Sequence, residues 1–220
     1  VSPNGDYLVT TRSRVDELPI SLLINREGQE VLELETANPI GLPKGWQWPQ
    51  PVTFIAADGH TDLYGVIYRP PGFSPEKSYP VLDFSCAHPG YSYVPHGAFV
   101  NGPFLGAPYL EAAAYAALGF VVVAMEVRGM PYRHKSFQDA SYGRIASANS
   151  FIDRIAGLQQ IAKQYSYMDL DRVGIIGCDG ITSPVYGLLE HPEFYKVGVM
   201  ANFEDSRFTA ASWGELFEGV

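Results

Sequence analysis

The sequence predicts an α/β fold in which a mostly parallel sheet is covered by helices on both faces. From residue 52 onward, strand-like and helix-like segments alternate, which is the pattern of parallel strands joined by helical crossovers. The stretch GFVVVAM at residues 119–125 is rich in β-branched residues and has the length of a buried strand. The stretch at residues 150–164 instead repeats apolar residues every three or four positions, which indicates a helix.

The composition excludes several classes of protein. Of the 220 residues, 46% are hydrophobic and 18% are charged, which fits a soluble globular protein. The net charge of -9 argues against nucleic acid as a partner, because phosphate binding needs a basic face. No apolar run approaches the roughly 18–20 residues of a membrane span. The first residues, VSPNGDYLV, lack the basic start and apolar stretch of a signal peptide.

Residues 1–37 predict the end of a β-propeller domain. Strand-like stretches lie at residues 7–11, 20–25 and 30–35, separated by Asn4-Gly5 and Glu27-Gly28. Three short strands cannot bury a core of their own, so we expect them to belong to a larger unit. The stretch SPNGDYLV also resembles the S-P-D-G-x-x-L pattern that opens propeller blades.

Residues 38–51 are rich in proline and predict a linker. The strands expected after it lie at residues 52–56, 63–69, 81–84, 120–125, 172–176 and 197–200. Ligands bind at the carboxyl ends of strands in such sheets, so the loops after Phe84, Met125 and Ile176 are the expected site.

Two helices are expected between these strands. One is the alanine-rich stretch at residues 109–117. The other covers residues 150–164, with Asn149 or Ser150 as its N-cap. Its predicted apolar face consists of Phe151, Ile155, Leu158 and Ala162.

The stretch RVGIIGCDGITS at residues 172–183 has the outline of a nucleophile elbow. An apolar run ends in a glycine, and polar residues follow where a helix should start, as in the G-x-S-x-G turn that exposes a catalytic serine. With Gly177 as the first glycine, Asp179 occupies the serine position and Ile181 occupies the position of the last glycine.

Four stretches in order resemble the prolyl oligopeptidase / dipeptidyl peptidase IV family of serine peptidases. They are FIAADGHTDLYGVIYRPPGFSPEKSYPVL at 54–82, GFVVVAMEVRG at 119–129, YSYMDLDRVGIIG at 165–177 and LLEHPEFYKVGVMAN at 188–202. The third approaches the elbow, and the second is similar to the family's D-x-R-G segment, with Glu126 in place of Asp. The resemblance implies an α/β-hydrolase fold with about six of its eight strands at residues 52–220. It also implies the last blade of a β-propeller at residues 1–37 and a linker at 38–51.

The resemblance implies a serine nucleophile, a histidine base, an aspartate and a tyrosine that stabilises the oxyanion. Asp179 at the nucleophile position is a poor attacking group for amides, and its charge would repel the intermediate. A one-residue gap inside the elbow would instead place Cys178 at the nucleophile position, with Gly180 two residues later. Both alignments stay open.

The oxyanion tyrosine is also replaced. In the stretch CAHPG, Cys86 falls at the tyrosine position and His88 falls where glycine is usual, and a thiol is a weak donor. None of the five histidines follows the sixth strand, where the family's catalytic base lies. The resemblance further matches Thr209 and Trp213 with two tyrosines of the family's proline-accepting pocket.

The cysteines allow three readings. Cys86 and Cys178 could be buried free thiols, could form a disulfide, or could bind a soft metal together with His88 and Asp179. We expect free thiols, with no metal and no cofactor.

These observations leave three functions open, and whether the chain is an enzyme is uncertain. The first is an inactive dipeptidyl-peptidase-IV-like homologue that binds a peptide or another subunit. The second is a hydrolase with Cys178 as nucleophile and its Asp and His supplied by sequence beyond residue 220. The third is a scaffold subunit of a larger assembly.

A sheet that ended at its sixth strand would expose an apolar edge. We therefore expect more of the same polypeptide, or another subunit, to complete the sheet. A periplasmic or extracellular location is an expectation from the resemblance alone.

Overall fold

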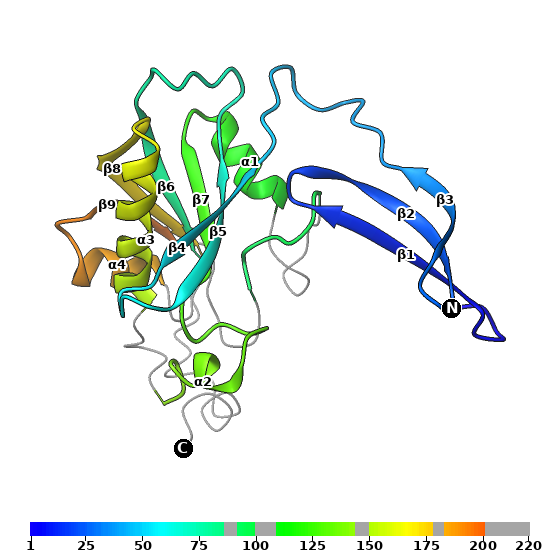
Figure 1. Ribbon diagram of the computed structural model, residues 1–220. Helices are drawn as coiled ribbons and strands as arrows, with labels where there is room; N and C mark the ends of the chain where they lie inside the picture. The colour runs from blue at the N-terminus through cyan, green and yellow to red at the C-terminus, as the bar shows by residue number, and fades with distance from the viewer. Residues whose placement is uncertain (86–91, 100–108, 144–149, 178–182, 201–220) are drawn as a thin grey trace.

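The computed structural model describes residues 1–85, 92–99, 109–143, 150–177 and 183–200. These residues form a three-stranded sheet near the N-terminus and a six-stranded sheet with helices (Figure 1). Within the described ranges, no helix is both long enough and apolar enough to cross a membrane.

The six-stranded sheet has the strand order β4-β5-β7-β6-β8-β9. Its strands are β4 (Gln50–Ile55), β5 (Asp62–Tyr68), β6 (Tyr79–Ser85), β7 (Val121–Met125), β8 (Met168–Gly177) and β9 (Tyr195–Met200). The first three neighbours in this order pair antiparallel, and the pairs from β7 to β9 are parallel. All six strands expected from the sequence are confirmed, although β8 begins four residues earlier than predicted.

Among the described residues, four helices accompany the sheet. They are α1 (Tyr109–Ala117), α2 (Lys135–Gln138), α3 (Ser150–Gln164) and α4 (Pro184–Glu190). The bounds predicted for α1 and α3 are confirmed, and Asn149, one of the two predicted caps, lies outside the described residues. The single-turn helix α2 was not predicted from the sequence. It begins after His134, whose Nδ1 accepts a hydrogen bond from the Phe137 amide.

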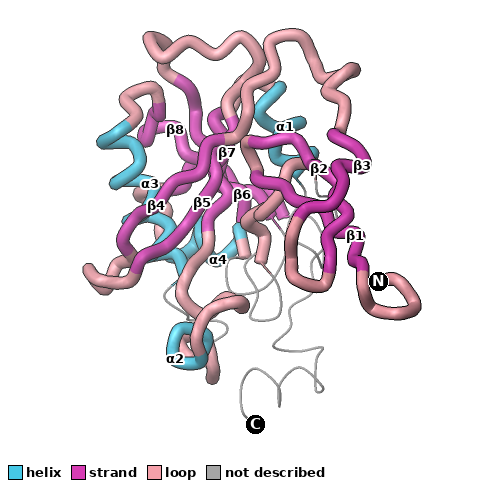
Figure 2. The backbone as a smooth tube through the Cα atoms, turned by 45° about the vertical axis from the view of Figure 1, so that its right-hand side comes forward, coloured by secondary structure: helices cyan, strands magenta, loops and turns pink. Residues whose placement is uncertain are grey.

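The sheet is covered on both faces, as the sequence predicts (Figure 2). In β7, Val121, Val123 and Met125 pack on the side of α3, whereas Val122 and Ala124 pack on the side of α1. Alternate residues of a strand point to opposite faces, so a strand that is buried on both sides is apolar throughout. This explains the unbroken run VVVAM.

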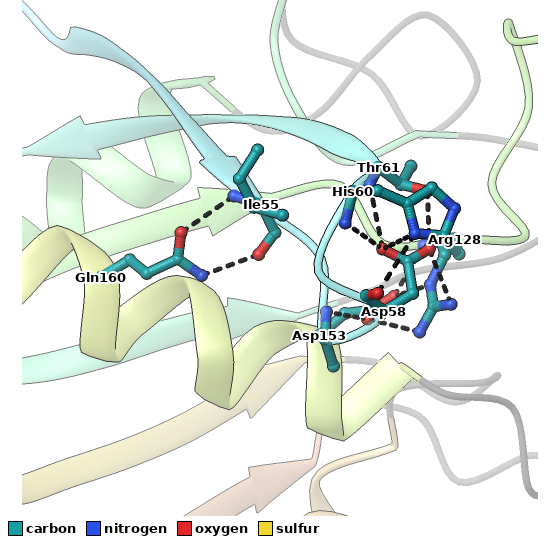
Figure 3. A network of polar contacts seen from close by, with 8 residues as sticks. Ile55, Asp58, His60, Thr61, Arg128, Asp153 and Gln160 are labelled. Carbon is teal, nitrogen blue, oxygen red and sulfur yellow. Dashed lines mark hydrogen bonds and ion pairs between the residues drawn. The ribbon is translucent and has the colours of Figure 1, made fainter.

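The edge strand β4 is protected by a side chain of α3. Gln160 accepts a hydrogen bond from the Ile55 amide at 3.0 Å and donates one to the Ile55 carbonyl at 2.7 Å (Figure 3). The amide group therefore takes the place of a neighbouring strand at this position. Pro51, on the same strand, has no N–H to offer. Both features discourage pairing with another chain along this edge.

The three-stranded sheet is an antiparallel meander of β1 (Tyr7–Arg14), β2 (Glu17–Asn25) and β3 (Glu30–Thr36). It exposes much of its apolar surface, because Val9 and Leu32 are 57% and 55% exposed. Two hydrogen bonds join it to the rest near the end of β1: the Ala98 amide donates to the Ser13 hydroxyl at 3.0 Å, and the Tyr109 hydroxyl of α1 donates to the Val15 carbonyl at 3.0 Å. The assignment of residues 1–37 to a propeller blade, and the boundaries at 38–51 and 52–220, stay predictions.

Candidate functional site

The parallel strands β6, β7 and β8 end side by side, so their carboxyl ends lie at the same end of the six-stranded sheet. Phe84 pairs with both Ala124 and Ile176, and Ser85 pairs with Gly177. The three strands therefore end side by side, and the loops that follow Phe84, Met125 and Ile176 begin close together, as the sequence predicts.

Gly177 is required by the close approach of β8 to β6. A Cβ atom built on Gly177 would lie 1.4 Å from the Ser85 carbonyl oxygen. Any other residue would have to push the two strands apart. Gly177 is thus the last residue of β8 and is fixed as a glycine by packing, at the position where the elbow should begin.

A buried polar cluster lies inside the fold close to these strand ends. The guanidinium of Arg154, on α3, forms an ion pair with the Asp83 carboxylate of β6, and both side chains are almost completely buried. The Tyr195 hydroxyl of β9 donates to the same carboxylate at 2.8 Å. Arg154 also donates to the carbonyls of Met125 at 3.1 Å and Phe84 at 3.0 Å, so it joins α3 to two strand ends.

The charges in this cluster stabilise one another. Burial by itself lowers the pKa of Arg154, but the Asp83 carboxylate outweighs burial and the net shift is upward. Burial and the same carboxylate raise the pKa of the Tyr195 hydroxyl well above its ordinary value. The tyrosine stays protonated and acts as a donor. The cluster joins α3 to β6 and β9 through buried hydrogen bonds.

A second polar cluster holds the loop after β7 (Figure 3). Arg128 donates to both carboxylate oxygens of Asp153 on α3, at 2.9 and 2.8 Å, and to Asp58 of the β4–β5 turn at 3.0 Å. Asp153 also accepts from the Ala57 amide at 2.9 Å. This arginine therefore ties a turn, a loop and a helix together at the same end of the sheet.

The Asp58 carboxylate is held in its charged form. Burial raises the pKa of Asp58. Hydrogen bonds from Thr61 and His60 and the charge of Arg128 lower this pKa by more than burial raises it, so the net shift is strongly downward. Thr61 contributes its hydroxyl at 2.6 Å and its amide at 2.9 Å.

Glu126, the first residue after β7, is nine-tenths buried. Its Oε1 accepts from the Tyr64 amide at 2.9 Å and from Arg133 at 2.7 Å, while no described residue donates to its Oε2. Burial raises the pKa of Glu126, and Arg133 offsets part of that rise. Arg133 in turn lies over the rings of Tyr64 and Phe137, at 5.2 and 4.6 Å from their centroids.

A cleft of about 570 Å³ opens beside Glu126. It lies between the turn after β1, the strands β4 and β5, and the loops that carry His96 and Tyr132. Tyr132 has a left-handed backbone, with φ of 72°, and its ring is exposed. Non-glycine residues in that conformation cluster at functional sites. The cleft is lined by aromatic rings and by Glu126, a carboxylate that suits a ligand with a hydrogen-bond donor.

The site residues predicted from the sequence lie outside the described residues. They are Cys86, His88, Cys178, Asp179, Thr209 and Trp213. Their roles therefore stay predictions, as do the three readings of the cysteines. In the part of the chain that is described, no group of three His, Cys, Asp or Glu side chains gathers as a metal site.

Sequence reasoning missed both polar clusters. One signal was available, because Asp83 interrupts the apolar strand VLDFS and Arg154 falls on the apolar side of α3. Opposite charges inside two buried elements indicate a buried ion pair. Nothing in the sequence indicated that Asp58 would join Arg128 and Asp153, because their separations along the chain are large.

Known proteins resemble this chain in sequence and in structure. The profile of the prolyl oligopeptidase family matches residues 108–208. Dipeptidyl peptidase 8 from Mus musculus is 31% identical over 152 residues, and its Homo sapiens counterpart is 30% identical over the same length. Each match covers 69% of this chain and 16% of the relative, so the chain spans about a sixth of these relatives.

A solved structure described as a dipeptidyl aminopeptidase IV from Bacteroides ovatus superimposes with a TM-score of 0.75 at 26% identity. The superposition covers 91% of this chain and 27% of that one. The likeness confirms the predicted α/β-hydrolase fold.

Proposed function

This chain belongs to the prolyl oligopeptidase / dipeptidyl peptidase IV family, and we propose that it is a homologue that has lost the hydrolytic chemistry and binds a peptide or another subunit. The chain spans about a sixth of its curated relatives, so activity and partners are stated here as a proposal.

The position of Gly177 carries the proposal. The elbow places a glycine two residues before its nucleophile. Counting from Gly177 assigns Asp179 to the nucleophile position, and packing against Ser85 explains why a glycine is needed there. Counting toward Cys178 instead would make Ile176 the first elbow residue. Ile176 is a buried strand residue that pairs with Phe84, so the register favours Asp179.

Two replacements together remove the chemistry. An aspartate at the nucleophile position brings a negative charge to the place where the oxyanion would form. Cys86 follows Ser85 directly and offers only a weak donor at the oxyanion position. Each replacement alone would lower the rate, and the pair leaves neither an attacking group nor its stabilising donor.

The cleft beside Glu126 supports a binding role. Glu126 lines this cleft with Tyr64 and Tyr132, and no described residue donates to its Oε2 oxygen. An ammonium or amide group of a peptide could donate to this oxygen while its side chains contact the rings.

Covalent probes test the loss of chemistry in the intact protein. A fluorophosphonate should not label it, because no serine nucleophile is expected. A thiol-directed substrate analogue should react with native protein no faster than with free cysteine. Labelling by the fluorophosphonate, or fast labelling of native protein that Cys178→Ala abolishes, would restore the hydrolase reading.

A peptide-binding measurement tests the second half of the proposal. A library of short peptides would be titrated against native protein and against Glu126→Gln, with Glu111→Gln on the exposed side of α1 as the control. We expect binding that Glu126→Gln weakens about tenfold or more and Glu111→Gln leaves unchanged. Equal binding by all three proteins would contradict a role for the cleft.

A scaffold role is the second candidate. Exposed apolar side chains gather on the three-stranded sheet, at Val9 and Leu32, and on β9, at Val197 and Val199. Apolar surface of this kind marks contact with further protein. Co-purification of a second polypeptide that covers these residues, with no peptide bound, would favour this role over peptide binding.

A further inference from the structure

Segment 92–99, in the connection between β6 and α1, is fixed to the three-stranded sheet. The Ala98 amide donates to the Ser13 hydroxyl at 3.0 Å, where β1 ends. Val94 and Ala98 are buried in the same apolar cluster as Val15, which lies in the turn between β1 and β2. A hydrogen bond and apolar packing therefore both hold the segment against the end of β1.

The same segment borders the cleft. His96 is one of the lining residues, and its ring meets the Tyr132 ring edge to face, with the centroids 6.4 Å apart. Tyr132 lies in the loop after β7, so this contact joins two loops that line the cleft. Both side chains are exposed. The position of the contact therefore depends on how the backbone of each loop is held.

Phe99, at the end of the segment, has a left-handed backbone with φ of 59°. A bulky aromatic residue rarely adopts this conformation, which persists only where the surroundings hold it. The rings of Trp46, Trp48 and Tyr109 surround Phe99, with centroids 6.4, 5.8 and 5.4 Å from its own. Loss of this packing would let Phe99 return to an ordinary φ, so the segment has a held state and a released state.

The packing around Phe99 depends on where the three-stranded sheet lies. The Tyr109 hydroxyl donates to the Val15 carbonyl at 3.0 Å, so a ring that packs on Phe99 is bonded to the turn after β1. The hydrogen bond from Ala98 to Ser13 acts on the residue next to Phe99. A displacement of the sheet therefore disturbs the contacts that keep Phe99 in its strained conformation.

We propose that segment 92–99 couples the three-stranded sheet to the cleft. While the sheet is docked, the segment is held and His96 stays against Tyr132. When the sheet moves away, the segment is released and this side of the cleft changes shape. The inference concerns regulation of the cleft, and it rests on the proposed function only for the claim that a peptide binds there. Binding in the cleft and docking of the sheet then favour each other to the same extent.

Amide hydrogen exchange of the intact protein tests this coupling without a ligand. Ser13→Ala removes the acceptor of the Ala98 amide. We expect about fivefold faster exchange in segment 92–99 and in the peptide that contains Tyr132, because loss of one hydrogen bond shifts a local opening equilibrium by about that factor. Thr11→Ala, two residues earlier on β1, is the matched control and should leave both regions unchanged.

Phe99→Leu tests the coupling from the other end. It removes the ring that packs on the two tryptophans and on Tyr109. Since coupling is reciprocal, this substitution should speed exchange at residues 13–16. Circular dichroism would confirm that each variant folds.

Two results would overturn the proposal. One is faster exchange in Ser13→Ala that stops at segment 92–99 and leaves the Tyr132 peptide unchanged. The other is the same exchange in Ser13→Ala and Thr11→Ala. A peptide found to bind the cleft should bind Ser13→Ala about fivefold more weakly and Thr11→Ala equally well. Exchange that changes as expected in a protein that binds no peptide would support the coupling and contradict the peptide-binding role alone.

Discussion

The bodies of β6 and β8 differ from the residues that follow them. Within the strands, Asp83 is paired with Arg154 and Tyr195, and Gly177 fits against Ser85 with no room for a side chain. Beyond the strands, the proposed alignment matches Cys86 with the family's oxyanion tyrosine and Asp179 with its serine. Under the proposed function, the packing of the two strands is kept while the reacting groups that follow them are lost.

This difference separates the residues that the sheet needs in order to pack from the residues that hydrolysis needs. The buried ion pair and the glycine are needed for the sheet to pack, whatever follows the strands. The reacting groups are needed only for hydrolysis. Changes in the framework should therefore affect stability strongly, and changes after the strands should affect it little. The following substitutions test that division, beginning with the largest expected effect.

Asp83→Leu should cost about 3–5 kcal/mol of unfolding free energy, because it leaves the Arg154 guanidinium buried without a partner. The double variant Asp83→Leu, Arg154→Leu should recover much of the loss, since apolar residues of similar volume often replace a buried ion pair with little penalty. Denaturant titration of the three proteins measures both effects. A single variant as stable as native protein would show that the cluster is not a structural unit.

Gly177→Ala should cost about 3 kcal/mol, because the new methyl group would overlap the Ser85 carbonyl and force β6 and β8 apart. Gly174→Ala on the same strand is the matched control. The nearest atom to a Cβ there lies at 3.5 Å, which is an ordinary contact, so we expect a loss below about 1 kcal/mol. Equal losses in the two variants would contradict the close approach of the strands.

Gln160→Leu should cost about 1–3 kcal/mol, because the Ile55 amide and carbonyl lose their partners while the side-chain volume is kept. Gln159→Leu changes the neighbouring exposed residue and should have almost no effect. The first variant should also aggregate more readily, because β4 then offers an open edge. Light scattering during refolding would show this, and equal scattering by both variants would argue against edge protection by Gln160.

Asp58 should make stability depend on acid pH. Its pKa is lowered in the folded state, so its contribution is present above the unfolded pKa of about 4 and is lost as the pH falls toward the folded value. Asp58→Asn should therefore be less stable than native protein at pH 7, on the order of 1 kcal/mol for this partly exposed group. The gap should narrow between pH 4 and pH 3. A gap that does not change with pH would mean that the Arg128 cluster does not hold the carboxylate charged.

Much of the fold was predictable, and the reasons are local. The run VVVAM indicates a strand that is buried on both faces, and the period of residues 150–164 indicates a helix that is buried on one face. Both patterns can be recognised without knowing which elements pack against them. The polar clusters were not predictable in this way. Asp83 meets Tyr195 across 112 positions of sequence, and Asp58 meets Arg128 across 70. Such pairs depend on sheet order, which the spacing of residues does not contain.

Part of the candidate site was predictable from the sequence and part was not. A parallel sheet implies that the strands end side by side, and Gly177, which begins the predicted elbow, was visible in the sequence. The cleft beside Glu126 was not visible in the sequence, because it is formed by the turn after β1, by β4 and β5, and by two later loops. The departure from the family's pattern at Glu126 was noted without any indication that its side chain would be buried and bonded to Arg133.

The most direct measurement is turnover of a dipeptidyl amide substrate, such as a Gly-Pro anilide, by the intact protein and by its Cys178→Ala and Asp179→Ala variants. We expect no release of the anilide above the uncatalysed rate from any of the three proteins, with all three folded. Turnover by native protein that either substitution abolishes would show a working nucleophile after β8. In that case the framework positions an active elbow, and the proposed loss of chemistry is wrong.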